Sequence, residues 1–415
     1  MCSLGSEKDA VCERVSSLLD TIETTAPDKM GQNAVIPSLQ ALIRGGTLGI
    51  KKEVNFMSSL TGEVLMDTSS TGKERPWKTH KSNSQLLSES FERLHKPSKA
   101  ERVCNCGSSL KFHACPSGHE KRLTWANFCR VRLCPMCSWR RSLLLAHQLK
   151  QIAHEANKRK PLRWLFLTLT VKNCDSEDLQ NTIDLMMKSF HRLSGYKRFE
   201  NSIEGHFRAF EITRNIFDDT YHPHFHVLLA VEPNYFRDTK KYIKTEEWVQ
   251  MWRKALQVNY DPICDIRIVK NKRNPEKEMK ILADKGIELA SSAVAELSKY
   301  STKSEDYLIY NEYKQVQKGS KVKMVPITSS GISEQRTDDA VATLDAALAY
   351  RRLIAFGGIL KEIREELDLA DIESDDVDLV HADEDTTCRC SVCGSNMLEE
   401  LYSWIPGVNN YMKKE

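Results

Sequence analysis

The sequence predicts an α+β fold in which one antiparallel sheet carries helices against one face. Three observations support this prediction. Between residues 163 and 303 the order is strand–helix–strand–strand–helix–strand–helix. A short polar link joins the two middle strands, as in a hairpin. The intervening helices have apolar residues at intervals of three and four, so each buries one side against the sheet.

Each element has its own local pattern. Strands are expected at 163–171, 206–215, 222–231 and 263–271, because these stretches are rich in β-branched and aromatic residues. One helix is predicted from Leu179, Ile183, Met186, Phe190 and Leu193, and another from Trp248, Met251, Trp252 and Leu256. Further helical segments are expected at 34–48, 138–158, 280–303 and 338–367. The pattern alone yields four strands.

The 415 residues leave room for several domains, with 40% hydrophobic and 28% charged residues and a net charge of +3. Residues 1–100 are expected to be disordered or a linker, and 101–158 a basic cysteine module ending in a helix. The sheet domain is placed at 159–325, a helical region with an acidic segment at 326–380, and a cysteine tail at 381–415. No apolar run approaches the ~20 residues that span a bilayer. The N-terminus also lacks a signal-peptide pattern, so a cytoplasmic protein without membrane partners is predicted.

The segment TYHPHFHVLLAV, residues 220–231, has three histidines at alternate positions. Alternate residues of a strand point to the same face, so His222, His224 and His226 share one face. Phe225, Val227 and Leu229 form an apolar opposite face. Imidazoles at this spacing can bind one divalent ion, although a solvated sheet edge would show the same pattern.

Glu211 is the proposed third ligand. It lies on the preceding strand and can pair opposite His224, about 5 Å away across the hairpin. Two imidazoles and one carboxylate leave coordination positions of a divalent ion open, as Lewis-acid catalysis requires. The sequence therefore predicts a catalytic metal site at His224, His226 and Glu211.

A nucleophile is sought on the predicted helix at 288–308. Glu296, Tyr300 and Lys303 are spaced by four and three residues and share one helix face. A tyrosine hydroxyl has an ordinary pKa of ~10, and a neighbouring lysine or a polarised phosphate can assist it. The same spacing also occurs in solvated helix faces. Tyr307 and Tyr310 are rival tyrosines.

The 13 cysteines are read as metal ligands or free thiols, because cytoplasmic thiols stay reduced. The zinc candidates near the N-terminal side are Cys104, Cys106, Cys115, Cys129, Cys134 and Cys137. Cys134 and Cys137 form a C-x2-C half-site, and His113 or His119 could replace a thiolate. A second zinc site is considered at Cys388, Cys390 and Cys393, with His381 nearby. Unstructured tail thiols are the alternative there.

Charge is unevenly distributed along the chain. Between Lys121 and Arg141 there are six basic residues and no acidic ones, whereas 362–385 contains twelve acidic residues and one arginine. The acidic stretch is interpreted as a solvated or regulatory segment. The candidate DNA-binding residues are Arg130, Arg132, Arg140 and Arg141. Together with nearby aromatic residues, this module could grip DNA phosphates and stack on bases.

Five ordered motifs resemble the rolling-circle plasmid replication initiator (Rep) family of the HUH endonuclease class, the branch with a single catalytic tyrosine. They are FLTLTVKN (166–173), TYHPHFHVLLAV (220–231), AELSKYSTKSEDYL (295–308), ANFCRVRLCPMCSWRRS (126–142) and RRLIAFGGILKEI (351–363). The resemblance extends over residues 103–380. It implies a five-stranded antiparallel sheet with the histidine pair on a central strand, one strand more than the pattern yields.

The resemblance also implies roles for single residues. His224 and His226 match the histidines that hold Mg²⁺ or Mn²⁺, and Tyr300 matches the nucleophile that becomes linked to a 5′-phosphate. Glu296 matches the acid thought to activate water at termination, and Lys303 follows the tyrosine as in the family. The implied substrate is the plasmid's double-strand origin, single-stranded or extruded as a hairpin. The freed 3′-OH would prime a host polymerase.

Two alternatives to an origin-nicking enzyme are considered. A transposase or relaxase would use the same chemistry but often carries a second tyrosine or a helicase-like extension. A non-catalytic zinc-dependent repressor would have a structural histidine strand. The sequence contains no G-x4-G-K-[ST] phosphate-binding loop, so unwinding is assigned to a host helicase.

Overall fold

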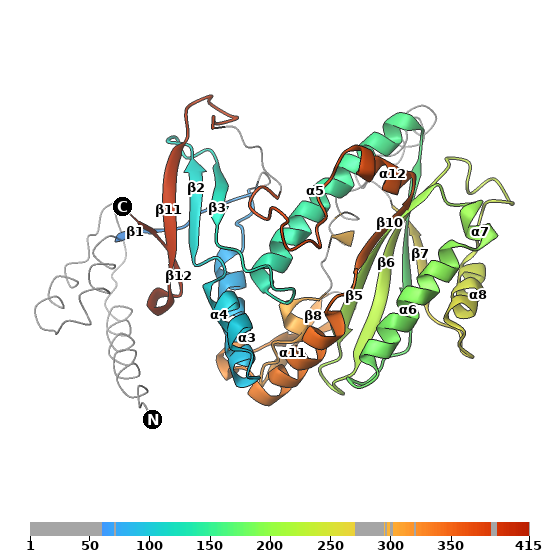
Figure 1. Ribbon diagram of the computed structural model, residues 1–415, viewed down its shortest axis with the longest axis horizontal. Coiled ribbons are helices and arrows are strands. Elements are labelled where there is room, and N and C mark those ends of the chain that lie inside the picture. The colour runs from blue at the N-terminus through green and yellow to red at the C-terminus, as the bar shows by residue number, and fades with distance from the viewer. Residues whose placement is uncertain are drawn as a thin grey trace, which may run out of the picture. The chain divides into compact units, whose positions relative to one another are not determined.

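The computed structural model describes residues 60–69, 72–269, 294, 297–298, 302–318, 321–382 and 388–414 (Figure 1). The predicted helix at 34–48 lies outside these ranges, as does most of the predicted helix at 280–303. The chain divides into two compact units. The first contains the described parts of 1–78, 108–122 and 388–415, and the second those of 79–107 and 123–387.

The first unit is built on a five-stranded sheet of order β1-β12-β11-β2-β3. The strands are β1 (Leu60–Val64), β2 (Ser109–Ala114), β3 (Lys121–Ala126), β11 (Leu398–Ile405) and β12 (Asn410–Lys414). β3 continues across the boundary into the second unit. Phe112 packs edge-on against Trp77 and Tyr402, with ring centroids 5.9 Å apart in both pairs. The sheet thus unites strands from the three predicted regions 1–100, 101–158 and 381–415.

Two helices occupy part of the predicted N-terminal linker. They are α3 (Trp77–Arg93) and α4 (Pro97–Asn105). In α3, Ser84, Leu87, Ser88 and Phe91 are buried at the three- and four-residue steps of a helix face. Two of these four residues are serines, so the face is too polar to stand out in the sequence. The chain between 77 and 105 is therefore helical and packed rather than a linker.

The second unit contains a five-stranded antiparallel sheet of order β10-β5-β6-β4-β7. Its strands are β4 (Arg163–Thr170), β5 (Gly205–Arg214), β6 (Tyr221–Val231), β7 (Cys264–Ile268) and β10 (Ile354–Gly358). The first four are those that the sequence pattern predicts. This confirms the α+β fold with a five-stranded antiparallel sheet and places the histidine strand, β6, at its centre.

The fifth strand, β10, corrects the helix predicted over 338–367. The structure has α11 (Glu334–Leu348), then β10, then α12 (Ile359–Glu366). Gly358 has φ +57°, and a Cβ built there would lie 2.3 Å from the carbonyl oxygen of Glu204. A continuous helix cannot include that conformation. Ile354 pairs with Ala209 on β5, so the sheet edge decides the structure of this stretch.

Helices α6 (Leu179–Ser194) and α8 (Thr245–Leu256) pack against one face of this sheet, and α7 (Lys197–Glu200) follows α6. Phe225 on β6 contacts Phe190 of α6, at 5.4 Å between ring centroids, and Trp252 of α8, at 6.2 Å. Burial of each such ring contributes roughly 2–3 kcal/mol. Residues 224 and 226 therefore point to the opposite face, away from α6 and α8.

The remaining elements of the second unit are α5 (Pro135–Arg159), a hairpin of β8 (Tyr313–Lys318) with β9 (Lys321–Pro326), and short 3-10 turns. α5 contacts α12. Among the helices described, none is both long enough and apolar enough to cross a membrane.

His206 on β5 is expected to make stability depend on pH. Its ring lies between Phe190 and Phe199, at 5.4 and 5.5 Å. Burial, assisted by Arg208, lowers the pKa of His206 from 6.5 to about 4. Below about pH 6.5 the unfolded chain gains a proton that folded His206 does not, so the free energy of unfolding falls until about pH 4.

The predicted loss of unfolding free energy on acidification reaches about 3 kcal/mol, at ~1.4 kcal/mol per pKa unit. Chemical denaturation of the wild type and of His206→Gln between pH 7 and pH 4 measures it. The variant should lose this part of the pH dependence, whereas His191→Gln, at an exposed position, should retain it. Equal slopes in the wild type and His206→Gln would contradict the assignment.

Candidate functional site

The hairpin of β5 and β6 brings together the residues of the predicted metal site. Glu211 pairs directly with His224, which is the register expected from the sequence. Ala209 pairs with His226, so Glu211 lies beside both imidazoles on the same face. All three side chains are largely buried, with exposed fractions of 3% for Glu211, 8% for His224 and 9% for His226.

The two imidazoles direct the same ring nitrogen toward the carboxylate. Nε2 of His226 lies 3.0 Å and Nε2 of His224 lies 3.5 Å from Oε2 of Glu211. Nδ1 of His224 is 3.0 Å from the carbonyl oxygen of His222. A carbonyl only accepts hydrogen bonds, so neutral His224 carries its proton on Nδ1 and keeps the Nε2 lone pair free for a ligand.

Lys303 completes this cluster from a distant part of the chain. Its Nζ lies 2.7 Å from Oε1 of Glu211, on the carboxylate oxygen that the histidines do not contact. Burial alone would raise the pKa of Glu211, but the adjacent His224 and His226 imidazoles and the Lys303 ammonium outweigh it. They hold the pKa well below its ordinary value, so Glu211 stays ionised.

The ligand atoms of Glu211, His224 and His226 all lie within 4.8 Å of one another. This set of two imidazoles and one carboxylate could hold a divalent cation and would leave coordination positions open for a substrate oxygen. Lys303 adds a positive charge beside the cluster, which favours an anionic substrate.

Asp306 holds Lys303 in place, a role that the sequence does not reveal. Its carboxylate accepts hydrogen bonds from the backbone N–H of Lys303, at 3.0 Å, and of Arg214 at the end of β5, at 3.1 Å. Burial raises the pKa of Asp306 to about 6. Its sequence context resembles an ordinary turn, and the contact with β5 exists only in the folded chain.

Tyr300 and Glu296 lie outside the described residues. Lys303, three residues after Tyr300 in the sequence, is described and contacts Glu211. The rival Tyr307 is fully buried, and its hydroxyl donates to the carbonyl oxygen of Leu133 at 2.7 Å. That hydroxyl is unavailable to a substrate. Tyr310 is half-buried, and burial raises its pKa, which disfavours the phenolate.

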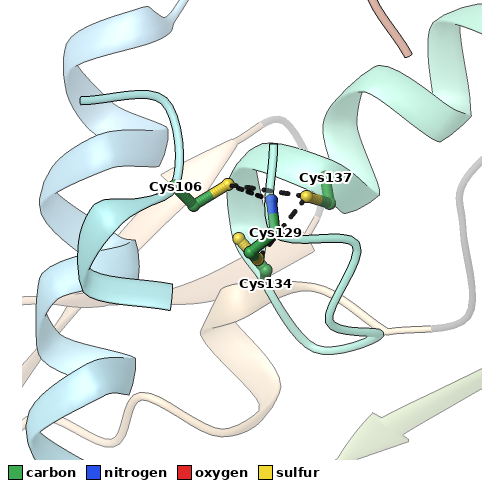
Figure 2. A group of neighbouring side chains, drawn as sticks. All are labelled: Cys106, Cys129, Cys134 and Cys137. Carbon is green, nitrogen blue, oxygen red and sulfur yellow. Dashed lines mark hydrogen bonds between the residues drawn. The ribbon is translucent and has the colours of Figure 1, made fainter. Parts of the chain in front are cut away.

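Four of the predicted zinc candidates converge at the N-terminus of α5, as Figure 2 shows: Cys106, Cys129, Cys134 and Cys137. Sγ of Cys137 lies 3.5 Å from that of Cys106 and 3.7 Å from that of Cys129. Zn–S bonds of ~2.3 Å in a tetrahedron imply S–S edges of ~3.8 Å. These cysteines could therefore hold a metal such as zinc in a closed, structural site.

Backbone and side-chain donors surround these thiols. The N–H of Cys129 donates to Sγ of Cys106 at 3.3 Å, and the N–H of Arg130 donates to Sγ of Cys137 at 3.2 Å. The buried Lys81 ammonium donates to the carbonyl oxygens of Cys104 and Cys106 at 2.5 and 2.9 Å. The N–H dipoles and the Lys81 ammonium would offset part of the charge of four thiolates.

The other candidate cysteines fall into different groups of possible metal ligands from those that the sequence predicts. Cys104 is exposed and does not join the four. Cys115 instead groups with His119, Cys390 and Cys393 in the first unit. Cys388, His113 and His381 are in neither group. Spacing along the chain could not predict this division, because Cys115 and Cys390 meet only through the pairing of β2 with β11.

Two of the four arginines proposed to bind DNA are structural. Arg140 and Arg141 are 0% and 3% exposed. Arg140 donates to the carbonyl oxygens of Leu379 and Val380 at 2.8 and 2.6 Å, and Arg141 to that of Ile372 at 3.3 Å. They fasten part of the acidic segment onto α5, so this part is packed rather than solvated. Arg130 and Arg132 remain partly exposed.

Replacing Arg140 with methionine is expected to lower the free energy of unfolding by about 2–4 kcal/mol. Two buried carbonyl groups would lose their donor, at about 1–3 kcal/mol each. Arg253→Met is the matched control, because Arg253 makes a solvent-exposed ion pair with Asp261 at 2.9 Å that contributes at most about 1 kcal/mol. Denaturant titration compares the two. Equal stability of the variants would contradict the structural role of Arg140.

The family and the relatives that match this chain are all described as replication or rep proteins. A family described as Replication protein matches residues 120–412. A "Protein rep" of Bacillus amyloliquefaciens is 41% identical over 85% of this chain and 97% of the relative. One from Lactiplantibacillus plantarum is 36% identical, covering 78% and 92%. A "Replication protein" of Staphylococcus aureus is 34% identical, covering 57% and 87%.

Proposed function

Because this chain belongs to the plasmid replication initiator (Rep) family, we propose that it starts rolling-circle replication by nicking one strand of its plasmid's double-strand origin. The observation that carries the proposal is the convergence of Glu211, His224 and His226 with Lys303. A buried carboxylate, two imidazoles whose Nε2 atoms face it and an adjacent ammonium suit the chemistry of an HUH-type endonuclease.

The residues on β5 and β6 are proposed to hold Mg²⁺ or Mn²⁺. Such an ion would supply charge neutralisation at the scissile phosphate of single-stranded or extruded origin DNA. The rigid centre of the sheet supports the ligands: Glu211 stays ionised, and the His222 carbonyl orients His224. Lys303 balances the charge of Glu211 and attracts the DNA backbone toward the site.

The proposed nucleophile is the Tyr300 hydroxyl. Its oxygen attacks the phosphorus, the bond to the 3′ oxygen breaks, and that oxygen takes up a proton. The products are a 5′-phosphotyrosyl link and a free 3′-OH, which a host polymerase extends after a host helicase unwinds the duplex. Positioning and charge neutralisation provide most of the rate in phosphoryl transfer, so a small preorganised site is sufficient.

Glu296 is proposed to act at termination. As a general base it would remove a proton from the water that cleaves the regenerated origin and so frees a 3′-OH without a second protein link. That 3′ oxygen would then attack the phosphotyrosyl bond at Tyr300, which joins the DNA ends and releases the tyrosine hydroxyl. This assignment rests on the family resemblance and on the spacing of Glu296 and Tyr300 in the sequence.

The basic cysteine module around the start of α5 is proposed to contact the origin. Zinc bound by Cys106, Cys129, Cys134 and Cys137 would fix the start of α5. Arg130 and Arg132 nearby are partly exposed, and a DNA phosphate would have to compete with Glu373 for Arg132. Trp125 is 46% exposed and can stack on a base. Arg140 and Arg141 are excluded from this surface by their burial.

A nicking assay tests the proposed function. Purified full-length protein is mixed with supercoiled plasmid carrying its own origin, with Mn²⁺ or Mg²⁺ or with EDTA. We expect relaxed circles with one nick at a fixed position, a protein-linked 5′ end and a free 3′ end, and no product with EDTA. Nicking that persists in EDTA, or that leaves an unlinked 5′ end, would exclude the mechanism.

A further inference from the structure

We propose that Cys115, His119, Cys390 and Cys393 bind a zinc ion that fastens the C-terminal strands to the β2–β3 hairpin of the first unit. The four ligand atoms lie within 4.8 Å of one another. Sγ of Cys115 is 3.6 Å from Sγ of Cys393 and 3.5 Å from Nδ1 of His119, and Sγ of Cys390 is 3.7 Å from the same nitrogen. Three thiols and an imidazole form a complete tetrahedral zinc set.

Each half of the site is shaped locally. Cys115 and His119 lie in the turn that joins β2 to β3, where the N–H of Gly118 donates to the Cys115 carbonyl oxygen at 2.8 Å. Cys390 and Cys393 form a C-x2-C turn followed by Gly394, whose φ of +71° favours glycine. The N–H of Gly394 donates to the Cys390 carbonyl oxygen at 2.9 Å and closes that turn.

A second contact independently joins the two halves. Glu120 accepts hydrogen bonds from the backbone N–H and the side-chain hydroxyl of Ser391, at 2.5 and 3.2 Å. Two of the ligands, Cys115 and Cys390, pack with Met397 in a small buried cluster. The two half-sites are therefore held in a fixed relation by protein contacts, which favours a preformed metal site over thiols that meet by chance.

The thiols are too far apart for disulfide bonds and too closely grouped for unrelated cysteines. A disulfide joins its sulfur atoms at ~2.05 Å, whereas tetrahedral zinc–thiolate sites separate them by ~3.8 Å. The observed 3.6 Å between Cys115 and Cys393 matches the second value. With four protein ligands no coordination position is left for a substrate, so the predicted role is structural.

The position of the site in the sheet defines that role. Cys115 directly follows β2, and the C-x2-C turn precedes β11. Leu398 at the start of β11 pairs with Ala114 at the end of β2. A metal bond at this end of the ladder joins residues 278 positions apart, Cys115 and Cys393, and sets the register of β11, and through β11 that of β12.

The site also differs from the four-cysteine site in accessibility. His119 and Cys393 are exposed, whereas Cys106, Cys134 and Cys137 are each 0% exposed. A chelator in solution should therefore reach the zinc of the first unit sooner. We expect zinc to leave the wild-type protein in two phases, with the fast phase belonging to this site.

Zinc stoichiometry tests the proposal directly. Full-length wild type is expected to bind two zinc ions per chain, and Cys393→Ser one. Cys388→Ser is the matched control, because Cys388 is an exposed cysteine of the same segment that lies outside the group; it should keep both ions. Native mass spectrometry counts the ions. Two ions in Cys393→Ser, or one in Cys388→Ser, would overturn the assignment.

Hydrogen exchange on the wild type keeps the proposal testable if Cys393→Ser does not fold. Amides of β11 and β12 should lose protection as the fast-released zinc leaves, while those of β5 and β6 keep theirs. Unchanged protection of β11 and β12 after the fast phase would overturn the structural role. Neither measurement depends on DNA cleavage, so the zinc proposal and the nicking proposal can fail separately.

Discussion

The double variant His224→Ala, His226→Ala is expected to lose metal-dependent nicking of origin plasmid. Both Nε2 atoms that face Glu211 are removed, which leaves one carboxylate to hold the ion. Loss of the metal's charge stabilisation is worth several kcal/mol, so the rate should fall by roughly a thousandfold or more at ~1.4 kcal/mol per tenfold. Single-turnover nicking with Mn²⁺ measures the rate, and titration calorimetry measures Mn²⁺ binding.

His222→Ala is the matched control for this pair. His222 shares the strand face, but its Nδ1 lies 2.9 Å from the side-chain oxygen of Asn173, and it is not among the grouped metal ligands. Its loss should leave Mn²⁺ binding near the wild-type value. Circular dichroism should show that the double variant stays folded, because Phe225 still anchors the strand to α6 and α8. Undiminished nicking by a folded double variant would refute the metal site.

Tyr300→Phe is expected to abolish both nicking and the covalent protein–DNA product. The change removes one oxygen atom, which is the proposed nucleophile, and leaves the ring. The metal ligands are untouched, so Mn²⁺ and origin DNA should bind as in the wild type. A 5′-labelled origin strand that acquires the mass of the protein on a denaturing gel reports the covalent product. A labelled adduct formed by Tyr300→Phe would remove Tyr300 from the mechanism.

Tyr310→Phe and Tyr307→Phe serve as controls for the nucleophile. Tyr310→Phe should nick at the wild-type rate. Tyr307→Phe should also form the adduct but unfold more easily by about 1–2 kcal/mol, because the carbonyl oxygen of Leu133 loses its buried donor. If either variant failed to form the adduct while remaining folded, that tyrosine would replace Tyr300 as the candidate.

Local periodicity was sufficient to predict much of the sheet that carries the candidate site. The β-rich runs of β4, β5, β6 and β7 and the apolar step of α6 appear in the sequence because each element buries one face of its own. The alternation around His224 and the short link to β5 also predicted the pairing of Glu211 with His224, which the structure has. This was possible because the register of a hairpin depends on its own strands and on the length of the link between them. The family resemblance added a fifth strand without locating it.

What only the tertiary structure decided involves residues far apart in the chain. β10 is a strand because it pairs with β5, with Ile354 opposite Ala209, although helical sequence flanks it. Arg140 lies in a basic stretch that suggests a DNA contact. Its side chain is buried, however, and donates to the carbonyl oxygen of Leu379. Cys115 has its partners at Cys390 and Cys393 because β2 pairs with β11. Such contacts are selected by packing and by the satisfaction of buried polar groups, which leave no periodic signal in the sequence.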